Sequence, residues 1–241
     1  MSSPGPRIVV AMDVASGREA QALAAQLDPR LCRLKVGLEL FTACGPGLIE
    51  VLQAQGFEIF LDLKFHDIPN TVGRAVQTAA SLGVWMLNVH GLGGRRMLQA
   101  ARAALTNASA PLNTRPYLIA VTVLTSHAAS ELPEIGLAAD PAALAEQLAS
   151  IAAAEGLDGV VCSPHEAKRL RAARGPGFLL ITPGIRGAHD ASGDQRRTAT
   201  VSEALANGAD YVVVGRPITG SPDPAAALAR FGTEITAFFG L

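Results

Sequence analysis

The chain has 241 residues, of which 49% are apolar and 17% are charged, and its formal net charge is −1. No block of like charge stands out, which argues against a nucleic-acid or membrane-surface partner. Its N-terminus has no signal-peptide pattern, and no apolar run reaches the roughly 20 residues of a membrane helix, so we expect a cytoplasmic protein. The cysteines, Cys32, Cys44 and Cys162, show no C-x-x-C spacing, and we expect three buried, reduced thiols.

Short runs rich in β-branched and other apolar residues recur from one end of the chain to the other. Continuous apolar character is typical of strands buried on both faces, as in a parallel sheet with crossover helices. The eight predicted strands are 8–13, 33–37, 58–62, 85–90, 118–123, 159–162, 178–181 and 211–214.

Longer stretches rich in Ala, Leu, Gln and Glu separate these runs and predict helices. Asp140-Pro141 and Ser163-Pro164 provide capping signals at two of the starts. The predicted helices are 18–27, 48–55, 72–82, 95–105, 142–155, 164–173, 201–207 and 224–239.

Regular alternation without a break in composition predicts an α/β fold, a (β/α)₈ TIM barrel that occupies residues 1–241 as a single domain. The competing fold is a doubly wound open sheet. The turn after the first strand, 13–17, lacks the Gly-x-Gly-x-x-Gly fingerprint, which argues against a dinucleotide-binding sheet of that kind.

Charged side chains recur at the C-terminal ends of the predicted strands, where the active sites of such barrels lie. A charge at a buried strand end is costly unless it is paired or meets a ligand. One such residue could be an ion pair that closes the barrel, but a ring of six indicates a site. The six are Asp13, Lys35, Asp62, Lys64, Arg186 and Arg216.

The segment 62–71 is the densest in chemistry. If the strand continues, Asp62 and Lys64 share one of its faces. Nearby carboxylates raise the pKa of a lysine, so Lys64 is expected to act as a proton donor or an electrostatic clamp and not as a Schiff-base nucleophile. A structural alternative exists for Asp67, which could be the N-cap of the helix beginning near Pro69.

Two Gly-Arg motifs follow the last two strands, Pro183-Gly184-Ile185-Arg186 and Val214-Gly215-Arg216-Pro217. The loops at these positions commonly form a phosphate site in barrels, because glycine lets backbone N–H groups approach the anion and arginine adds charge-assisted hydrogen bonds. The alternative is two turns with solvated arginines. The polar segment 187–195 could be a lid over the phosphate or an ordinary exposed loop.

No metal site is indicated, since the five histidines form no H-x-x-x-H or H-E-x-x-H pattern. Lys35 stands where a Mg²⁺ enzyme would need an acid, so we expect an ammonium–carboxylate lattice at the barrel top. Asn88 and His90 could share the inward face of the fourth strand, where hydrogen bonding within the core is their commoner role.

The segment 62–72, Asp-Leu-Lys-Phe-His-Asp-Ile-Pro-Asn-Thr-Val, resembles the signature of the orotidine 5′-phosphate decarboxylase family almost letter for letter. The resemblance implies an enzyme that converts orotidine 5′-phosphate to uridine 5′-phosphate and CO₂ in de novo pyrimidine biosynthesis, without a metal or other cofactor. Supporting motifs lie at 11–13, 34–37, 88–90, 121–126, 182–186, 193–197 and 215–219.

The resemblance also implies residue roles. Lys64 would protonate carbon 6 of the pyrimidine as CO₂ leaves, with Asp62 beside the departing carboxylate. Asp67, as a third catalytic residue, and Thr71 would reach across the interface of a homodimer into the partner's site. Asp13 and Lys35 would hold the ribose. The phosphate would be bound by Arg186, Gln195, Gly215 and Arg216. The substrate would also be contacted by Ile68, Thr125 and Pro183.

Two rival functions remain open. A Mg²⁺-dependent phosphosugar decarboxylase of the same superfamily, such as a 3-keto-gulonate-6-phosphate decarboxylase, would share the D-x-K-x-x-D core. It would carry an acid near the second strand, where this chain has Lys35, although Glu39 lies one turn on. A non-catalytic barrel that binds a phosphometabolite would need the two arginines but not the three residues Asp62, Lys64 and Asp67 together.

Overall fold

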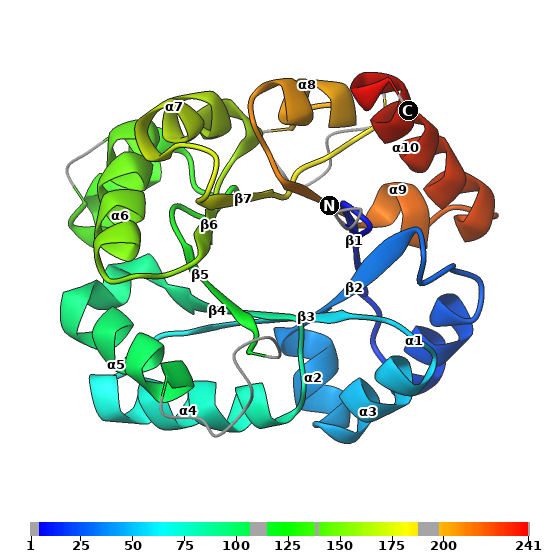
Figure 1. The fold of residues 1–241 in the computed structure, drawn as a ribbon, viewed down its shortest axis with the longest axis horizontal. Coiled ribbons are helices and arrows are strands. Elements are labelled where there is room, and N and C mark those ends of the chain that lie inside the picture. The colour runs from blue at the N-terminus through cyan, green and yellow to red at the C-terminus, as the bar shows by residue number, and fades with distance from the viewer. Residues whose placement is uncertain (1–4, 107–114, 138–139, 188–197, 241) are drawn as a thin grey trace.

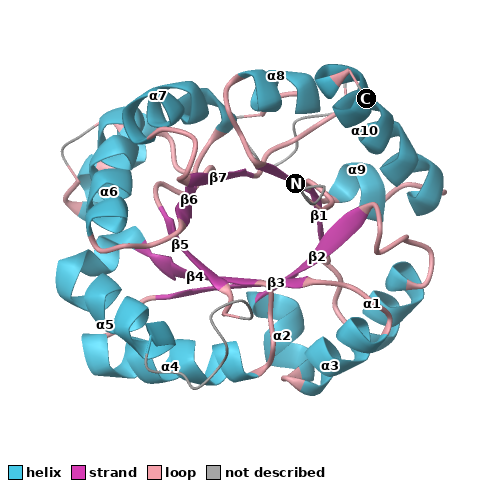
Figure 2. Cartoon of the chain, viewed as in Figure 1, coloured by secondary structure: helices cyan, strands magenta, loops and turns pink. Residues whose placement is uncertain are grey.

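Eight strands form a closed, all-parallel barrel in chain order in the computed structural model, which describes residues 5–106, 115–137, 140–187 and 198–240. The last strand pairs with the first, from Ile8 opposite Val212 to Val10 opposite Val214, and so leaves no free sheet edge. Figure 1 shows the helices as an outer ring around the strands, and Figure 2 shows the two layers by type of element. The predicted TIM barrel is confirmed, and the open-sheet alternative is wrong.

The strands agree with the predicted runs to within a few residues, with the largest extension in the third, which reaches Phe65. They are short, as expected for a barrel whose strands are buried on both faces. The strands are β1 (Ile8–Ala11), β2 (Cys32–Gly37), β3 (Ile59–Phe65), β4 (Met86–His90), β5 (Tyr117–Val121), β6 (Gly159–Val161), β7 (Leu179–Thr182) and β8 (Tyr211–Val214).

All eight predicted helices are present, and Asp140 and Ser163 cap two of them through side-chain hydrogen bonds to backbone N–H groups. Within the described residues, two short helices, α2 and α9, and three short 3₁₀ turns were not predicted. The helices are α1 (Gly17–Ala24), α2 (Leu38–Cys44), α3 (Gly47–Ala54), α4 (Pro69–Ser81), α5 (Gly94–Thr106), α6 (Pro141–Ala154), α7 (Pro164–Arg174), α8 (Val201–Ala206), α9 (Arg216–Thr219) and α10 (Pro224–Phe239); the 3₁₀ turns are η1 (Gly91–Gly93), η3 (Ala129–Glu131) and η4 (Pro133–Ile135).

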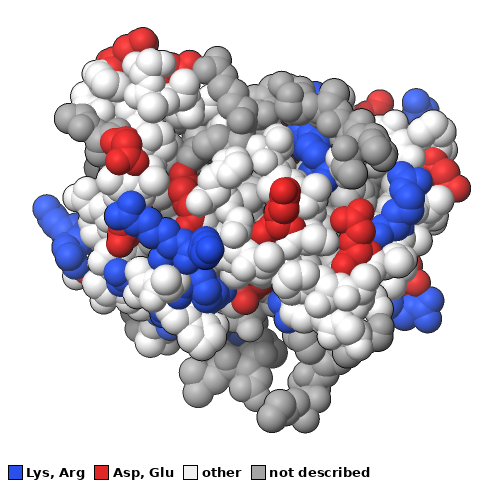
Figure 3. Space-filling view, turned by 90° about the horizontal axis from the view of Figure 1, so that it is seen from above, with Lys and Arg blue, Asp and Glu red and all other residues white. Residues whose placement is uncertain are grey.

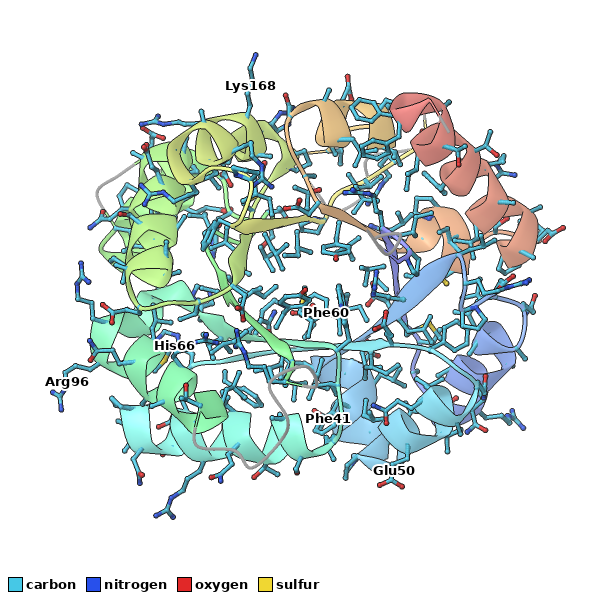
Figure 4. The ribbon with its side chains drawn as sticks, in the orientation of Figure 1. Phe41, Glu50, Phe60, His66, Arg96 and Lys168 are labelled. Atoms are coloured by element: carbon cyan, nitrogen blue, oxygen red, sulfur yellow. The ribbon has the colours of Figure 1, made fainter. Side chains whose placement is uncertain are left out.

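The core has two parts because alternate residues of each strand face opposite sides of the sheet. In β1, Ile8 and Val10 pack outward against the helices, whereas Val9 packs inside the barrel with Phe60 and Ile119. Figure 4 shows Phe60 inside the ring of strands, while Arg96 and other charged side chains project outward from the helices. The barrel is therefore a packed core and not a pore.

Arg33 closes the N-terminal end of the barrel. Its guanidinium lies over the rings of Trp85 and Tyr211, 4.1 and 5.3 Å from their centroids, and forms a 2.7 Å ion pair with Glu58. An arginine held in this way packs through its flat faces while its charge is paired at the rim. With this end closed, the opposite end is left for a ligand.

On the face shown in Figure 3, acidic and basic side chains are interspersed, with one cluster of basic groups. No described helix has the length and apolar character needed to cross a membrane.

All three cysteines are free, but Cys44, at the end of α2, is only half-buried, so the expectation of three buried thiols is wrong at that position.

Candidate active site

A cavity of about 230 Å³ lies at the C-terminal ends of the strands. Every one of the six charged residues predicted to gather there contributes to its lining. Loops that follow parallel strands meet at one end of a barrel, which is why residues far apart in the sequence converge. The predicted site residues in the lining are Asp13, Lys35, Asp62, Lys64, Thr125, Pro183, Arg186, Gly215 and Arg216.

Three predicted site residues lie outside this cavity, at the start of α4. Asp67, Ile68 and Thr71 are all exposed, with Ile68 at 67%. The Asp67 carboxylate accepts a 2.6 Å hydrogen bond from the backbone N–H of Ile68. The N-cap residue of α4 is Ile68, which makes no side-chain cap hydrogen bond, so the alternative that Asp67 is the N-cap is wrong. A role in a partner's site stays a prediction.

The backbone is irregular where β3 delivers its charged residues. Its pairing with β4 shifts register between Leu61 and Phe65. Within this bulge Lys64 has φ +50°, and it is the only non-glycine residue of the described chain with positive φ. The strand does continue beyond Asp62, which was the condition for Asp62 and Lys64 to share a face, but not as a regular strand. Both side chains nevertheless reach the cavity.

Asp62 lies at the centre of a buried charge network. Its Oδ1 is 2.7 Å from Lys64 Nζ, and its Oδ2 is 3.3 Å from Lys35 Nζ. Lys35 Nζ also lies 3.4 Å from Asp13 Oδ1 at the rim. The network therefore alternates in sign, as Asp13, Lys35, Asp62 and Lys64, which is the lattice expected from the sequence.

This alternation determines the ionisation of the two most buried members. Burial alone would raise the pKa of the Asp62 carboxyl, but the charges of Lys35 and then Lys64 outweigh it, so that pKa is lowered. Burial likewise opposes the charge on Lys35, but Asp62 and then Asp13 outweigh it, so the pKa of Lys35 is raised. Both groups are held ionised at neutral pH.

Asn88 also takes part in this network, a role that its sequence position did not predict. Its side chain is fully buried in β4, donates a 2.7 Å hydrogen bond to Asp62 Oδ1 and accepts one of 2.7 Å from the backbone N–H of Lys64. The only sequence signal was an amide at an inward-facing position of the strand next to β3. Further along β4, His90 stacks on His66 with ring centroids 5.4 Å apart.

The loops after β7 and β8 carry the arginine motifs to the same cavity. Arg186 is buried and donates a 2.8 Å hydrogen bond to the carbonyl of Ile185, whereas Arg216 is exposed at the first residue of α9. Gln195 and the segment 188–195 of the predicted lid lie outside the described residues. Between the arginines and the charge network the lining is largely apolar, with Val121, Val161 and other side chains.

The fold and the site together define a class, namely TIM-barrel proteins with a charged pocket at the C-terminal ends of the strands. Within that class, residues 6–231 match the model of one family, described as Orotidine 5′-phosphate decarboxylase / HUMPS family. The chain belongs to this family, and the resemblance noted in its sequence is confirmed.

Similar proteins extend over nearly the full length of the chain. The orotidine 5′-phosphate decarboxylase of Halorhodospira halophila is 59% identical over 238 residues, which cover 98% of this chain and 99% of that protein. The protein of the same name from Teredinibacter turnerae is 54% identical, with 98% and 100% covered. Among solved structures, the orotidine 5′-phosphate decarboxylase from Lactobacillus acidophilus has a TM-score of 0.84 at 38% identity and covers 95% of this chain and 98% of its own.

Proposed function

We propose that this chain decarboxylates orotidine 5′-phosphate to uridine 5′-phosphate and CO₂, as a step of pyrimidine biosynthesis. The observation that carries the proposal is a 2.7 Å pair of Asp62 and Lys64 in one cavity with Arg186 and Arg216. The Asp62–Lys64 pair suits a reaction in which negative charge develops at carbon, and the two arginines suit the binding of a phosphate group. Relatives of this name with more than half of their residues identical provide independent support.

In this proposal Lys64 is the proton donor. When the bond between carbon 6 and the carboxyl carbon breaks, CO₂ leaves and the electron pair stays on carbon 6. The Lys64 ammonium stabilises this charge and transfers a proton from Nζ to it. Asp62 lies beside the departing carboxylate and fixes the lysine, so the network needs no rearrangement at the moment of reaction.

The rest of the cavity holds the substrate in place. Asp13 and Lys35 contact the ribose hydroxyls, and Thr125 and Pro183 also contact the substrate. Arg186 and Arg216, together with Gln195 and Gly215, bind the phosphate. Phosphate binding energy then stabilises the ordered complex although the phosphate is remote from the bond that breaks.

The same geometry disfavours a Mg²⁺-dependent reaction. A divalent cation bound by Asp62 would lie close to the ammonium groups of Lys35 and Lys64, at 3.3 and 2.7 Å from that carboxylate. Repulsion of this kind is strong in a partly buried site. Acidic and carbonyl oxygens, not ammonium groups, are the surroundings that Mg²⁺ requires.

Ultraviolet absorbance provides the direct test. The purified protein is incubated with orotidine 5′-phosphate in the presence of a chelator, and loss of the orotate chromophore is followed. Turnover that is unchanged by the chelator is expected. Turnover that requires added Mg²⁺ would favour the metal-dependent relative, and saturable binding without turnover would favour a non-catalytic barrel.

We further propose that two copies of the chain form a homodimer with shared sites. Apolar side chains are exposed shortly after the ends of three neighbouring strands, Leu38 at 57%, Ile68 at 67% and Leu92 at 39%. We infer that these side chains form one apolar patch, the kind of surface that is typical of a protein interface. Asp67 and Thr71 lie beside Ile68 at the start of α4, where a two-fold partner would bring them to its own cavity.

Mixed dimers test this arrangement. Lys64→Ala and Asp67→Ala are each expected to be nearly inactive. After subunit exchange, a mixed dimer has one native site and one site with both lesions, so random mixing should restore roughly a quarter of wild-type activity. Exchange is verified by mass spectrometry of tagged chains. If activity stays flat after verified exchange, Asp67 acts within its own chain.

A further inference from the structure

We propose that Asn88 is a positioning residue that fixes Asp62 and Lys64 relative to each other, an inference that rests on the proposed function. Its amide contacts both residues at once. Nδ2 donates a hydrogen bond to the Asp62 carboxylate, and Oδ1 accepts one from the backbone N–H of Lys64; the donor–acceptor distance is 2.7 Å in both. No apolar side chain of the same size could make either contact, and a carboxylate could make only one of them.

The Lys64 backbone needs such a contact. A positive φ, +50° at this residue, brings Cβ close to a backbone oxygen and is costly for any residue except glycine. The bulge also shifts the pairing of β3 with β4 between Leu61 and Phe65. The N–H of Lys64 donates to the side-chain oxygen of Asn88, so Asn88 takes the place of a ladder hydrogen bond and stabilises the irregular backbone that carries the lysine.

The same Asn88 side chain also fixes the Asp62 carboxylate, through its Nδ2 group. Its Oδ1 is 2.7 Å from both Asn88 Nδ2 and Lys64 Nζ, while its Oδ2 faces Lys35. These donors define the plane of the carboxylate and hence the direction in which the lysine ammonium is held. Because Asn88 is neutral, it supplies this restraint without altering the balance of charges in the network.

A positioning role and a purely structural role predict different effects on kcat, KM and stability when Asn88 is replaced. A residue that only supports the core would cost stability when replaced, with no specific effect on the chemical step. A residue that aligns the proton donor would lower kcat while the ribose and phosphate contacts still hold the substrate, so KM would change little.

The main test is Asn88→Leu, which keeps the number and branching of the side-chain heavy atoms and removes both hydrogen bonds. Its matched control is Thr122→Val, which removes the 2.8 Å hydrogen bond from another fully buried side chain to the carbonyl of Val161, outside the charge network. We expect kcat of Asn88→Leu to fall about 100-fold, the size of effect that a displacement of about 1 Å produces. We expect KM to stay within about three-fold of wild type, and Thr122→Val to change kcat less than about two-fold.

Asn88→Asp provides a second, independent readout. It keeps an acceptor for the Lys64 N–H but places a carboxylate beside Asp62, which raises the pKa of Asp62. The acidic limb of the pH profile of kcat should therefore move to higher pH if the side chain at position 88 contacts Asp62 in the active enzyme. If Asn88→Leu does not fold, an unmoved limb overturns the contact on which the positioning role rests, and a kcat for folded Asn88→Leu within about three-fold of wild type overturns the role itself.

Amide hydrogen exchange separates this inference from the proposed function. In the substrate-free protein, the Lys64 amide should exchange at least about ten-fold faster in Asn88→Leu than in wild type, while the amides of β4 stay protected. If wild type fails to decarboxylate the substrate, the proposed function falls but this measurement still tests the restraint. If wild type is active and the Lys64 amide exchanges equally in both proteins, the restraint falls and the function stands.

Discussion

The two charged walls of the cavity differ in net charge and in how their charged side chains are paired. The wall at β1 to β3 holds two aspartates and two lysines whose formal charges cancel, with Asp62 at 7% exposure and paired on both oxygens. Among the described residues, the wall after β7 and β8 contributes two arginines to the cavity lining and no carboxylate. The first wall is neutral and ordered by its own contacts, whereas the described side chains of the second are positive.

The difference follows from what each wall would do. A dianionic phosphate keeps its charge throughout the reaction, so a wall that binds it needs net positive charge. A reacting centre changes its charge, so groups beside it must be held in fixed positions by partners of their own. Substitutions of Asp62 and Lys64 in the neutral wall should therefore affect mainly kcat, and the effect of substitutions in the positive wall should depend on the phosphate of the substrate.

The largest effect is expected for Lys64→Ala, which removes the proton donor and one of the two cations paired with Asp62. Loss of a general acid costs about 10²–10⁴-fold, and Lys64 also stabilises the developing charge, so kcat should fall by more than about 10⁴-fold. Turnover is measured by absorbance and folding by circular dichroism, with the outward-facing Lys168→Ala as control (Figure 4). A folded Lys64→Ala with as much as a tenth of wild-type activity would show that the neutral wall does not perform the chemistry.

A smaller effect is expected for Arg216→Ala in the positive wall. Removing a charge-assisted contact to phosphate should cost about 2–5 kcal/mol in kcat/KM. The comparison is between orotidine 5′-phosphate and orotidine, which lacks the phosphate, with Arg96→Ala as a control on the outer surface. The loss should be confined to the phosphorylated substrate. An equal loss on both substrates would mean that Arg216 supports the fold of the wall and does not bind phosphate.

The fold could be predicted because each strand and each long helix carries its own periodic pattern. The two missed helices, α2 and α9, have seven and four residues and follow β2 and β8 almost directly. Such short segments have no regular apolar face, because their residues line the cavity or the surface. They also contain too few residues for a helical period to be recognised in the sequence.

The charged site could be predicted from topology alone, since strand ends in a parallel barrel meet at one face. The contacts of Asn88 could not, because they depend on the register shift between β3 and β4 and on the positive φ of Lys64. Neither property has a local sequence signature. The proposed N-cap role of Asp67 failed for a related reason, since helix α4 takes Ile68 as its N-cap residue without any side-chain hydrogen bond.

The smallest effect concerns His90, a neutral group close to the neutral wall. Burial, and then electrostatic interaction with His66, Lys64 and His127, lowers the pKa of His90 from 6.5 to about 4. Its Nδ1 accepts a 3.3 Å hydrogen bond from the N–H of Leu92, which also requires an unprotonated ring nitrogen. A proton on this ring would add an uncompensated positive charge near Lys64.

The sign of the stability effect follows from this lowered pKa. Between pH 6.5 and about 4 the unfolded chain binds a proton at His90 that the folded chain does not, so the free energy of unfolding falls as the pH is lowered through this window. Because the ring is only half-buried, we expect a loss of about 1 kcal/mol after allowance for solvent screening. His90→Asn, which keeps an acceptor for the Leu92 N–H, should remove that part of the slope in urea unfolding measured from about pH 7 to pH 4. The exposed His165 offers a matched control, and His165→Asn should keep the wild-type slope. Parallel curves for wild type and His90→Asn would mean that His90 accepts a proton in the folded protein as readily as in the unfolded chain, and that the wall tolerates an added positive charge.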